Sequence, residues 1–211
     1  KRTMQDKNST IAAFLDAAAA KSPTPGGGSV AALAGALAAS MGEMCVNYSI
    51  GKKGLEAHQA DFAASLRDLS HARAMLLQLM VEDQAAYEAM TAARKLPADD
   101  PQRQGKLDAA TLACIRVPES IAAVGVAILQ QCDRLAETSN LYLLSDLAVC
   151  ADLAMAAVRC GVNNVRANIS SLTDLADRKA AESMMQSMQS RAVAMIQRIE
   201  PRIWERIGRG K

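Results

Sequence analysis

The sequence PTPGGGSVAALAGALAASMG, residues 23–42, carries the clearest structural information in this chain. Its two prolines end the preceding helix, and its three glycines, Gly26 to Gly28, permit positive φ and a close approach of the backbone to a partner. Ser29 is a suitable helix N-cap. The residues from Val30 to Gly42 carry almost no bulk on any face, so a neighbouring helix can pack at a short axial distance. We therefore expect a glycine loop that leads into a buried, close-packed helix.

The glycine run is a weak signal for ligand binding when taken alone. Glycine-rich loops cradle phosphates at helix N-termini, but the dinucleotide fingerprint needs a preceding β-strand and spaced glycines. The segment before this loop, Thr10 to Lys21, has a helical pattern instead. A loop and helix start without any ligand remains the alternative.

The composition indicates an all-α protein. Half of the 211 residues are apolar, only 3% are aromatic, and no alternating β-rich segment of useful length occurs. Lysine plus arginine (24) nearly balances aspartate plus glutamate (22), so neither charge nor aromatic stacking favours a nucleic-acid partner. We expect a frayed or disordered N-terminus at residues 1–9 and a single helical domain at residues 10–208.

The cysteines and the apolar runs favour a cytoplasmic protein without a membrane partner. We find no signal peptide and no uninterrupted apolar run of membrane-spanning length. Only two histidines occur, His58 and His71, and their spacing argues against a metal site or a histidine-based triad. The cysteines are odd in number, form no CxxC pair and are expected to be reduced core residues: Cys45, Cys114, Cys132, Cys150 and Cys160.

An uninterrupted helical pattern from Glu56 to Arg94 predicts one very long helix of about 58 Å at 1.5 Å per residue. A helix of that length usually needs a partner subunit to cover its far end. Its core stripe consists of Phe62, Leu66, Leu69, Arg73, Leu76, Met80, Asp83, Tyr87 and Met90. A carboxylate on such a face has a raised pKa, which suits a general acid or base. The alternative for Asp83 is a surface position at the edge of the stripe.

The sequence pattern predicts further helices in the second half of the chain. A turn at residues 96–101 has Asp100 as a cap, and Pro118 is expected to break or kink the helix that follows. Ser139-Asn140 closes that helix, and the next one should reach about Ser170. One face of this later helix has polar ends: Asp146, Cys150, Leu153, Ala157, Cys160, Asn164 and Asn168. These polar groups bind either a ligand or one another. Asp174 caps a last helix, which Pro201 bends.

Taken in order, several short motifs resemble the family of formiminotetrahydrofolate cyclodeaminases and methenyltetrahydrofolate cyclohydrolases. The resemblance spans roughly residues 10 to 200 and is closest to the free-standing bacterial form. The motifs are PTPGGGSVAAL at 23–33, Ile50-Gly51-Lys52-Lys53, Asp83-x-x-x-Tyr87 with Leu96-Pro97, Val117-Pro118, Ser139-Asn140, Ser145-Asp146-Leu147 and Asn164-Val165-x-x-Asn168. Ser139 departs from the glycine that is usual in the family at that position.

The resemblance implies an elongated, homodimeric multi-helix bundle that binds a reduced folate, with or without a polyglutamate tail, near the subunit contact. In the cyclodeaminase reaction, an amine nitrogen attacks the formimino carbon, ammonia leaves and 5,10-methenyltetrahydrofolate forms. In the cyclohydrolase reaction, water opens the methenyl bridge to the 10-formyl compound. Both reactions need one proton taken and one proton given, without a metal or any cofactor beyond the tetrahydrofolate substrate.

The resemblance also implies roles for individual residues. Asp83 is the expected proton relay, and Asp146 is the second catalytic candidate, as an electrostatic partner or a ligand of the pterin. The expected substrate-binding residues are Gly26, Gly27, Gly28, Ser29, Lys52, Lys53, Asn140, Ser145, Asn164 and Asn168. The two lysines either bind the glutamate tail or cap a helix C-terminus. A different class of function, a non-catalytic helical dimerisation or folate-binding module, stays open as the alternative.

Overall fold

The computed structural model describes residues 7–210, and the regular secondary structure in that range is entirely helical. Most of the segment that we expected to be frayed, residues 1–6, lies outside the described residues. The six α-helices are α1 (Ile11–Ala19), α2 (Gly27–Asn47), α3 (Gln59–Arg94), α4 (Arg103–Thr138), α5 (Leu144–Asn168) and α6 (Leu175–Arg209), with short 3-10 turns at Glu56–His58, Leu141–Leu143 and Ile169–Ser171. The expected all-α bundle is therefore confirmed, and α4 and α6 are about as long as the predicted long helix α3.

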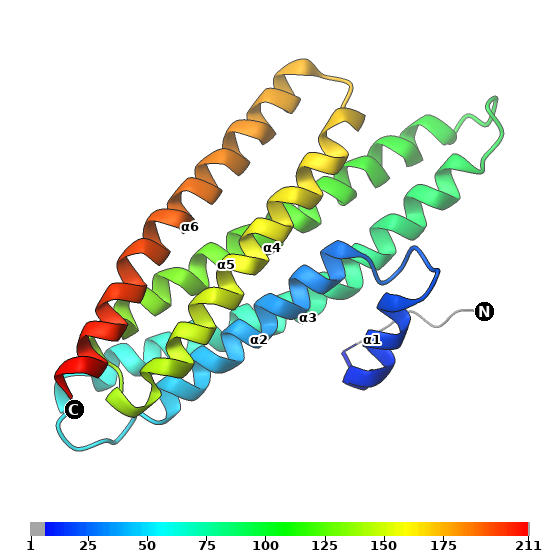
Figure 1. Cartoon of the computed structure of the whole chain (residues 1–211). Helices are drawn as coiled ribbons and strands as arrows, with labels where there is room; N and C mark the ends of the chain where they lie inside the picture. The colour runs from blue at the N-terminus through cyan, green and yellow to red at the C-terminus, as the bar shows by residue number, and fades with distance from the viewer. Residues whose placement is uncertain (1–6, 211) are drawn as a thin grey trace.

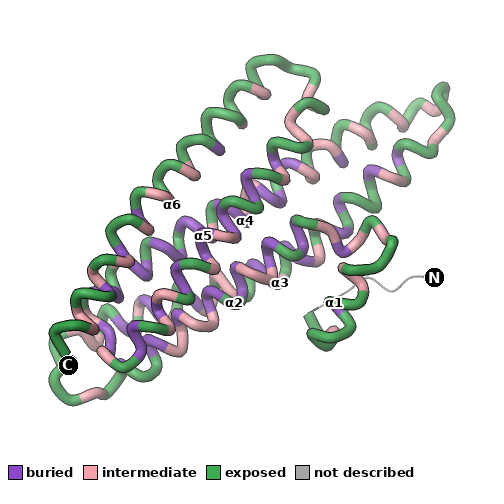
Figure 2. The backbone as a smooth tube through the Cα atoms, in the orientation of Figure 1, coloured by how far each residue is buried: buried purple, intermediate pink, exposed green. Residues whose placement is uncertain are grey.

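Helices α2, α3, α4 and α5 form a four-helix core in which each packs against at least two of the others, and α6 lies against both α4 and α5 (Figure 1). The buried side chains line the inner faces of these helices, whereas the N-terminal half of α6 is mostly exposed (Figure 2). The short helix α1 lies at the N-terminal end of α2, and the loop around Lys52 lies at the opposite end, beside the C-terminus (Figure 1).

Three glycines at intervals of seven residues bring α2 and α3 together. A Cβ atom added to Gly35 would lie 3.0 Å from a methyl carbon of Leu76, and one added to Gly42 would lie 3.1 Å from a methyl carbon of Leu69. The predicted close approach of a neighbouring helix to this small-residue segment is thus confirmed. Leu69, Leu76 and Asp83 follow one another at intervals of seven residues on α3, and the third glycine, Gly28, faces Asp83.

The start of α2 differs in detail from the sequence expectation. The helix begins at Gly27 with Gly26 as its N-cap, so Ser29 lies inside the first turn and is not the cap. The glycines at 26–28 do not have positive φ either, since only Gly51 and Gly54 adopt it among the described residues. These glycines are needed because they leave room for neighbouring side chains, whereas the two loop glycines next to Lys52 and Lys53 supply the left-handed conformation.

Pro118 was expected to break or kink α4, and the structure rules out the break, because the helix continues through it with its backbone satisfied. A proline has no N–H, so it cannot donate to the carbonyl four residues earlier, which here belongs to Cys114. The side-chain Nδ2 of Asn168 on α5 donates to that carbonyl at 3.2 Å. Asn168 therefore replaces the missing hydrogen bond and lets α4 run unbroken from Arg103 to Thr138.

This compensation predicts energetic coupling between two helices. We expect Asn168→Ala to lower the free energy of unfolding by about 1–2 kcal/mol, because it leaves the Cys114 carbonyl unpaired. In a Pro118→Ala background, the new N–H satisfies that carbonyl, so the same substitution should cost at most half as much. Urea unfolding of the four proteins of this double-mutant cycle measures the coupling. Equal costs in both backgrounds would contradict the role that we assign to Asn168.

Four smaller expectations are wrong. Tyr87, predicted in the core stripe, is 43% exposed. Cys114 and Cys160 are not core residues, since Cys114 is only partly buried and Cys160 is exposed; all five cysteines are free thiols. The turn at 96–101 extends further than expected, because Asp100 accepts from the N–H of Gln102 and α4 begins only at Arg103. The cap at Asp174 is confirmed, and Thr10 caps α1 in the same way.

The expectation of no membrane-length apolar run is also wrong. Three segments are long and apolar enough to cross a membrane by length and composition alone: Gly27–Asn47, Arg103–Thr138 and Leu141–Ser171. Their apolar windows have a mean hydropathy of 1.5 to 1.8, and 50–56% of each window is buried inside the bundle. The remainder of each window faces outward, which leaves apolar surface on the outside of the bundle.

Candidate functional site

The centre of the candidate site is the carboxylate of Asp83, which caps the N-terminus of α2 from the neighbouring helix α3. Its Oδ2 accepts from the backbone N–H of Ser29 at 2.8 Å and from the Ser29 hydroxyl at 2.9 Å. The Ser29 N–H is one of the first-turn groups that have no partner within their own helix. Ser29 therefore orients the carboxylate and holds it at the positive end of the α2 dipole.

The second oxygen of this carboxylate, Oδ1, has no hydrogen-bond partner within residues 7–210 and lies directly over Gly28. A Cβ atom on Gly28 would be only 2.0 Å from Oδ1 and 2.5 Å from Cγ. Any side chain at position 28 would collide with the carboxyl group. The glycine thus leaves space for the one oxygen that remains free to exchange a proton.

Burial raises the pKa of Asp83, and the two hydrogen bonds from Ser29 oppose that rise. The pKa of this carboxyl group thus lies closer to neutral pH than the pKa of an exposed aspartate, which suits a group that exchanges protons. Cys114 on α4 belongs to the same surroundings, because burial and the negative charge of Asp83 raise the pKa of its thiol. Residue spacing alone did not place Cys114 beside Asp83.

Asn164 presents an acceptor beside this carboxylate. Its Nδ2 donates to the Cys160 carbonyl at 2.8 Å, so its Oδ1 is turned towards the start of α2 and would lie 3.3 Å from a Cβ on Gly27. Asn168 lies one turn further along α5, and its Nδ2 donates to the backbone carbonyls of Cys114 and Asn164. Asn164 and Asn168 each keep a side-chain oxygen without a hydrogen-bond partner within residues 7–210, and Asn168 also supports the α4 backbone through its Nδ2.

A second group of predicted residues lies at the other end of α2. Lys52 donates to Oδ1 of Asn140 at 2.7 Å and lies over the Tyr142 ring, 4.8 Å from its centroid. Asn140 is buried, and it also donates from Nδ2 to the Tyr48 carbonyl and from its N–H to the Ser49 hydroxyl. The Asn140 amide thus joins the segment between α4 and α5 to the loop that follows α2. Lys52 is the group that Asn140 holds in place.

Asp146 belongs to this second group, because its charge contributes to raising the pKa of Cys45, near the C-terminal end of α2. Ser145 and Lys53 are both exposed at the same end. The sequence did not single out Tyr142, which is 82% exposed. A solvated aromatic ring held by a lysine suits contact with a flat ligand, and an exposed tyrosine beside a predicted site lysine was the available signal.

The structure therefore divides the predicted site residues between two ends of one chain. We call them the Asp83 end (Gly26–Ser29, Asp83, Asn164, Asn168) and the Lys52 end (Lys52, Lys53, Asn140, Ser145, Asp146). From Asp146 to Asn164 along α5 is 18 residues, or about 27 Å. The two carboxylates expected to serve one reacting carbon cannot both reach it within a single chain.

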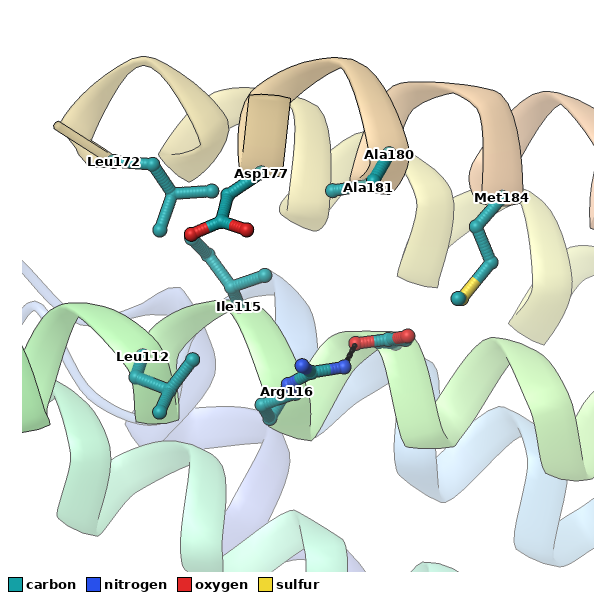
Figure 3. Close-up of a pocket in the computed structure, with 9 residues that line it drawn as sticks. Leu112, Ile115, Arg116, Leu172, Asp177, Ala180, Ala181 and Met184 are labelled. Carbon is teal, nitrogen blue, oxygen red and sulfur yellow. Dashed lines mark hydrogen bonds and ion pairs between the residues drawn. The ribbon is translucent and has the colours of Figure 1, made fainter. Parts of the chain in front are cut away.

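Other features of the surface do not add to this site. A cavity of about 160 Å³ between α4 and the N-terminal half of α6 is lined by Leu112, Asp177 and Met184 and by the Arg116–Glu119 ion pair (Figure 3). None of the predicted site residues lines it. Within residues 7–210, no three histidine, cysteine, aspartate or glutamate side chains are placed to hold a metal ion.

Comparison with protein families gives one match that covers most of the chain. Residues 10–190 match the family model described as formiminotransferase-cyclodeaminase. A methenyltetrahydrofolate cyclohydrolase from Methylorubrum extorquens is 31% identical over 196 residues, which cover 91% of this chain and 94% of that protein. The formimidoyltransferase-cyclodeaminase of Sus scrofa is 29% identical, and the match covers 90% of this chain but only 36% of the longer pig protein.

A solved structure agrees with these matches. The crystal structure of formiminotetrahydrofolate cyclodeaminase from Thermotoga maritima superimposes with a TM-score of 0.87 and 27% identity. The aligned region covers 94% of this chain and 97% of that chain. The similarity thus includes the whole helical bundle, with both the Asp83 end and the Lys52 end.

Proposed function

This chain belongs to the formiminotransferase-cyclodeaminase family, and from that membership we propose that it acts on the one-carbon bridge between N5 and N10 of tetrahydrofolate. It catalyses one of two related reactions, the cyclodeamination of 5-formiminotetrahydrofolate or the hydrolysis of 5,10-methenyltetrahydrofolate. The observation that carries this proposal is the partly buried Asp83 carboxylate, fixed through one oxygen by Ser29 and free at the other.

One carboxyl group serves both reactions. In cyclodeamination, N10 attacks the formimino carbon, the new C–N10 bond forms, and the bond to the departing nitrogen breaks. The formimino group enters protonated, as CH=NH2+, and Asp83 takes the proton of N10 and gives it to that nitrogen, which then leaves as ammonia with the electron pair of its bond to carbon. In hydrolysis, a water oxygen attacks the methenyl carbon and the C–N5 bond breaks, leaving the formyl group on N10. Asp83 then moves one water proton to N5, and the other is released.

The neighbouring groups suit the rest of the substrate. The free Oδ1 of Asn164 accepts a hydrogen bond from an N–H of the pterin. Lys52 and Tyr142 offer a cation and an aromatic face to the p-aminobenzoyl-glutamate portion. We assign Lys53, Ser145 and Asp146 to the same contact surface, and we propose no cofactor beyond the tetrahydrofolate substrate. A cytoplasmic location and a single helical domain at residues 10–208 complete the proposal.

Two assays separate the reactions. The protein is incubated with 5,10-methenyltetrahydrofolate while its near-ultraviolet absorbance is followed, and then with 5-formiminotetrahydrofolate while ammonia is measured. Loss of absorbance identifies a cyclohydrolase, and ammonia release identifies a cyclodeaminase. Thermal stabilisation by folate without either reaction would support a binding module in place of an enzyme.

We also propose that the protein is a homodimer, joined through the outer face of α2 and α5. This face carries exposed apolar side chains at intervals of seven residues on α2, with Val30 46% and Leu37 48% exposed, and Val149 of α5 is 47% exposed. In a two-fold dimer the same patch meets itself. We place the two-fold axis perpendicular to α2, so that α2 packs antiparallel to its copy and the Asp83 end of one subunit lies beside the Lys52 end of the other.

A single charge in this face should separate the subunits. We expect Leu37→Glu to yield a folded monomer that has lost turnover, because a buried carboxylate at the centre of the contact cannot be paired. Light scattering after size-exclusion chromatography measures the mass, and circular dichroism checks the fold. Leu112→Glu is the control, since Leu112 on α4 is equally exposed at 48% but lies outside this face. A Leu37→Glu dimer, or an active monomer, would argue against the interface.

A further inference from the structure

The arginines of α4 and α6 form a concave cluster that the proposed folate reaction does not use. A cavity of about 440 Å³ between these helices is lined by Arg134, Arg191 and Arg198, together with Gln130, Asp133 and Ala194. The chain as a whole has a formal net charge of only +2. Three guanidinium groups around one hollow therefore concentrate positive charge far above the average of the chain.

The single carboxylate in the cavity is already shared. Asp133 accepts from Arg198 at 2.7 Å and from Arg202 at 3.1 Å, and Arg202 also pairs with Glu137 at 3.3 Å. Arg134 and Arg191, by contrast, form no ion pair within the part of the chain that the structure describes. Asp133 thus anchors one wall of the cavity, while two guanidinium groups and the Gln130 amide remain as unused donors.

The spacing of these residues explains the hollow. Gln130 and Arg134 are one turn apart on α4, and Arg191 and Arg198 are two turns apart on the facing side of α6. Between the two α6 arginines stands Ala194, whose methyl group leaves the middle of the cavity empty. Guanidinium groups that line one cavity repel one another, and an anion bound between them relieves that repulsion; their planar forks match the oxygens of phosphate or carboxylate groups.

We propose that this arginine cavity binds a small anion that carries two or more negative charges on oxygen, as a phosphate group or a polycarboxylate does. The site is separate from the Asp83 end, because Arg134 is 20 residues from Cys114 along α4, or about 30 Å. Asn140 of the Lys52 end follows Arg134 by only six residues, but no residue of either end lines this cavity. The cavity is therefore an additional ligand site beside the proposed folate surface.

The test titrates inorganic phosphate, and separately citrate, into the full chain at constant ionic strength. Binding is followed by the side-chain N–H resonances of arginine and by the shift in melting temperature. We expect saturable binding that weakens about tenfold in Arg191→Gln or Arg134→Gln, the equivalent of one lost charge-assisted contact. Lys179→Gln on the same helix α6 removes the same charge outside the cavity and should leave binding unchanged. Phosphate binding alone would identify a phosphate ligand, and citrate binding alone a polycarboxylate.

A second variant tests the shape of the cavity independently of its charge. Ala194→Leu keeps every arginine but fills the hollow, so it should weaken binding at least as much as Arg191→Gln. Folate turnover serves as the separate readout and should be unchanged in these variants. The proposal is overturned if neither anion binds saturably, if Lys179→Gln weakens binding as much as the cavity variants, or if Ala194→Leu binds like the parent.

Discussion

Replacing Asp83 by asparagine is expected to lower kcat by about a thousandfold or more, because the relay carboxyl can then neither take nor give a proton. The shape of the site should survive, since an amide oxygen can still accept the two hydrogen bonds from Ser29 that hold Oδ2. We therefore expect a folded dimer that still binds folate. Steady-state kinetics of both reactions, with a folate-induced shift in melting temperature as the binding readout, measure this result.

The same substitution should change the pH dependence in two ways. Burial raises the pKa of Asp83, so the ionised base is lost and the rate falls as the pH drops through this raised value. The raised pKa in the folded state also makes a contribution to stability that is present at low pH and lost as the pH rises through it. The asparagine of Asp83→Asn cannot ionise, so the variant does not lose this stability as the pH rises. At neutral pH its melting temperature should equal or exceed that of the parent. Normal turnover in this variant, or an unchanged acid limb in its residual rate, would remove Asp83 from the mechanism.

The second large effect is expected from Gly28→Ala. The added methyl group would lie 2.0 Å from Oδ1 of Asp83 and 2.5 Å from its Cγ, so the carboxylate must move or the helices must separate. Overpacking of this kind costs about 1–3 kcal/mol of stability. A displacement of about 1 Å in a catalytic group lowers the rate about a hundredfold. We expect both losses together, measured by urea unfolding and by kcat.

Gly105→Ala is the matched control for this experiment. Gly105 is also a helical glycine, but a Cβ added there meets nothing within 4 Å. The substitution should stabilise the protein by about 0.5–1 kcal/mol, as alanine does within a helix, without changing kcat. If Gly28→Ala behaved in the same way, Oδ1 could not lie over the start of α2 as described.

Much of the fold followed from periodicity. The stripe on α3 repeats every seven residues, and its members Phe62, Leu69 and Leu76 are fully or almost fully buried. Asp83 stands at the next position of that repeat, so its place on an apolar face could be predicted from spacing alone. The glycines of α2 that face this stripe have the same interval of seven, and that match was an unused sequence signal for the α2–α3 pairing.

The local chemistry around these helices was harder to predict. Ser29 has the residue type and position of an N-cap, yet a carboxylate from another helix satisfies the first turn. Asn168, a predicted substrate ligand, also donates to the backbone carbonyl that Pro118 leaves without its usual partner. In both cases, a side chain from another helix forms the hydrogen bond that the backbone group lacks within its own helix. Residue spacing within one helix cannot predict such a contact.

The separation of Asp146 from Asn164 followed from spacing, because 18 residues of helix set them about 27 Å apart at the two ends of one face. Spacing could not show that the other predicted site residues divide between the same two ends, because they come from different segments of the chain. In the homodimer that we propose, the Lys52 end of one subunit meets the Asp83 end of the other, and residue spacing within one chain contains no information about such a contact.

The most direct measurement of the central claim is subunit complementation between Asp83→Asn and Asp146→Asn. Each variant alone should be nearly inactive. If each site takes Asp83 from one subunit and the Lys52 end from the other, an equal mixture of exchanged subunits contains half heterodimers, and each heterodimer has one intact site. The account predicts recovery of about one quarter of the parent activity after subunit exchange. No recovery in a mixture whose heterodimers are verified by mass spectrometry would contradict it.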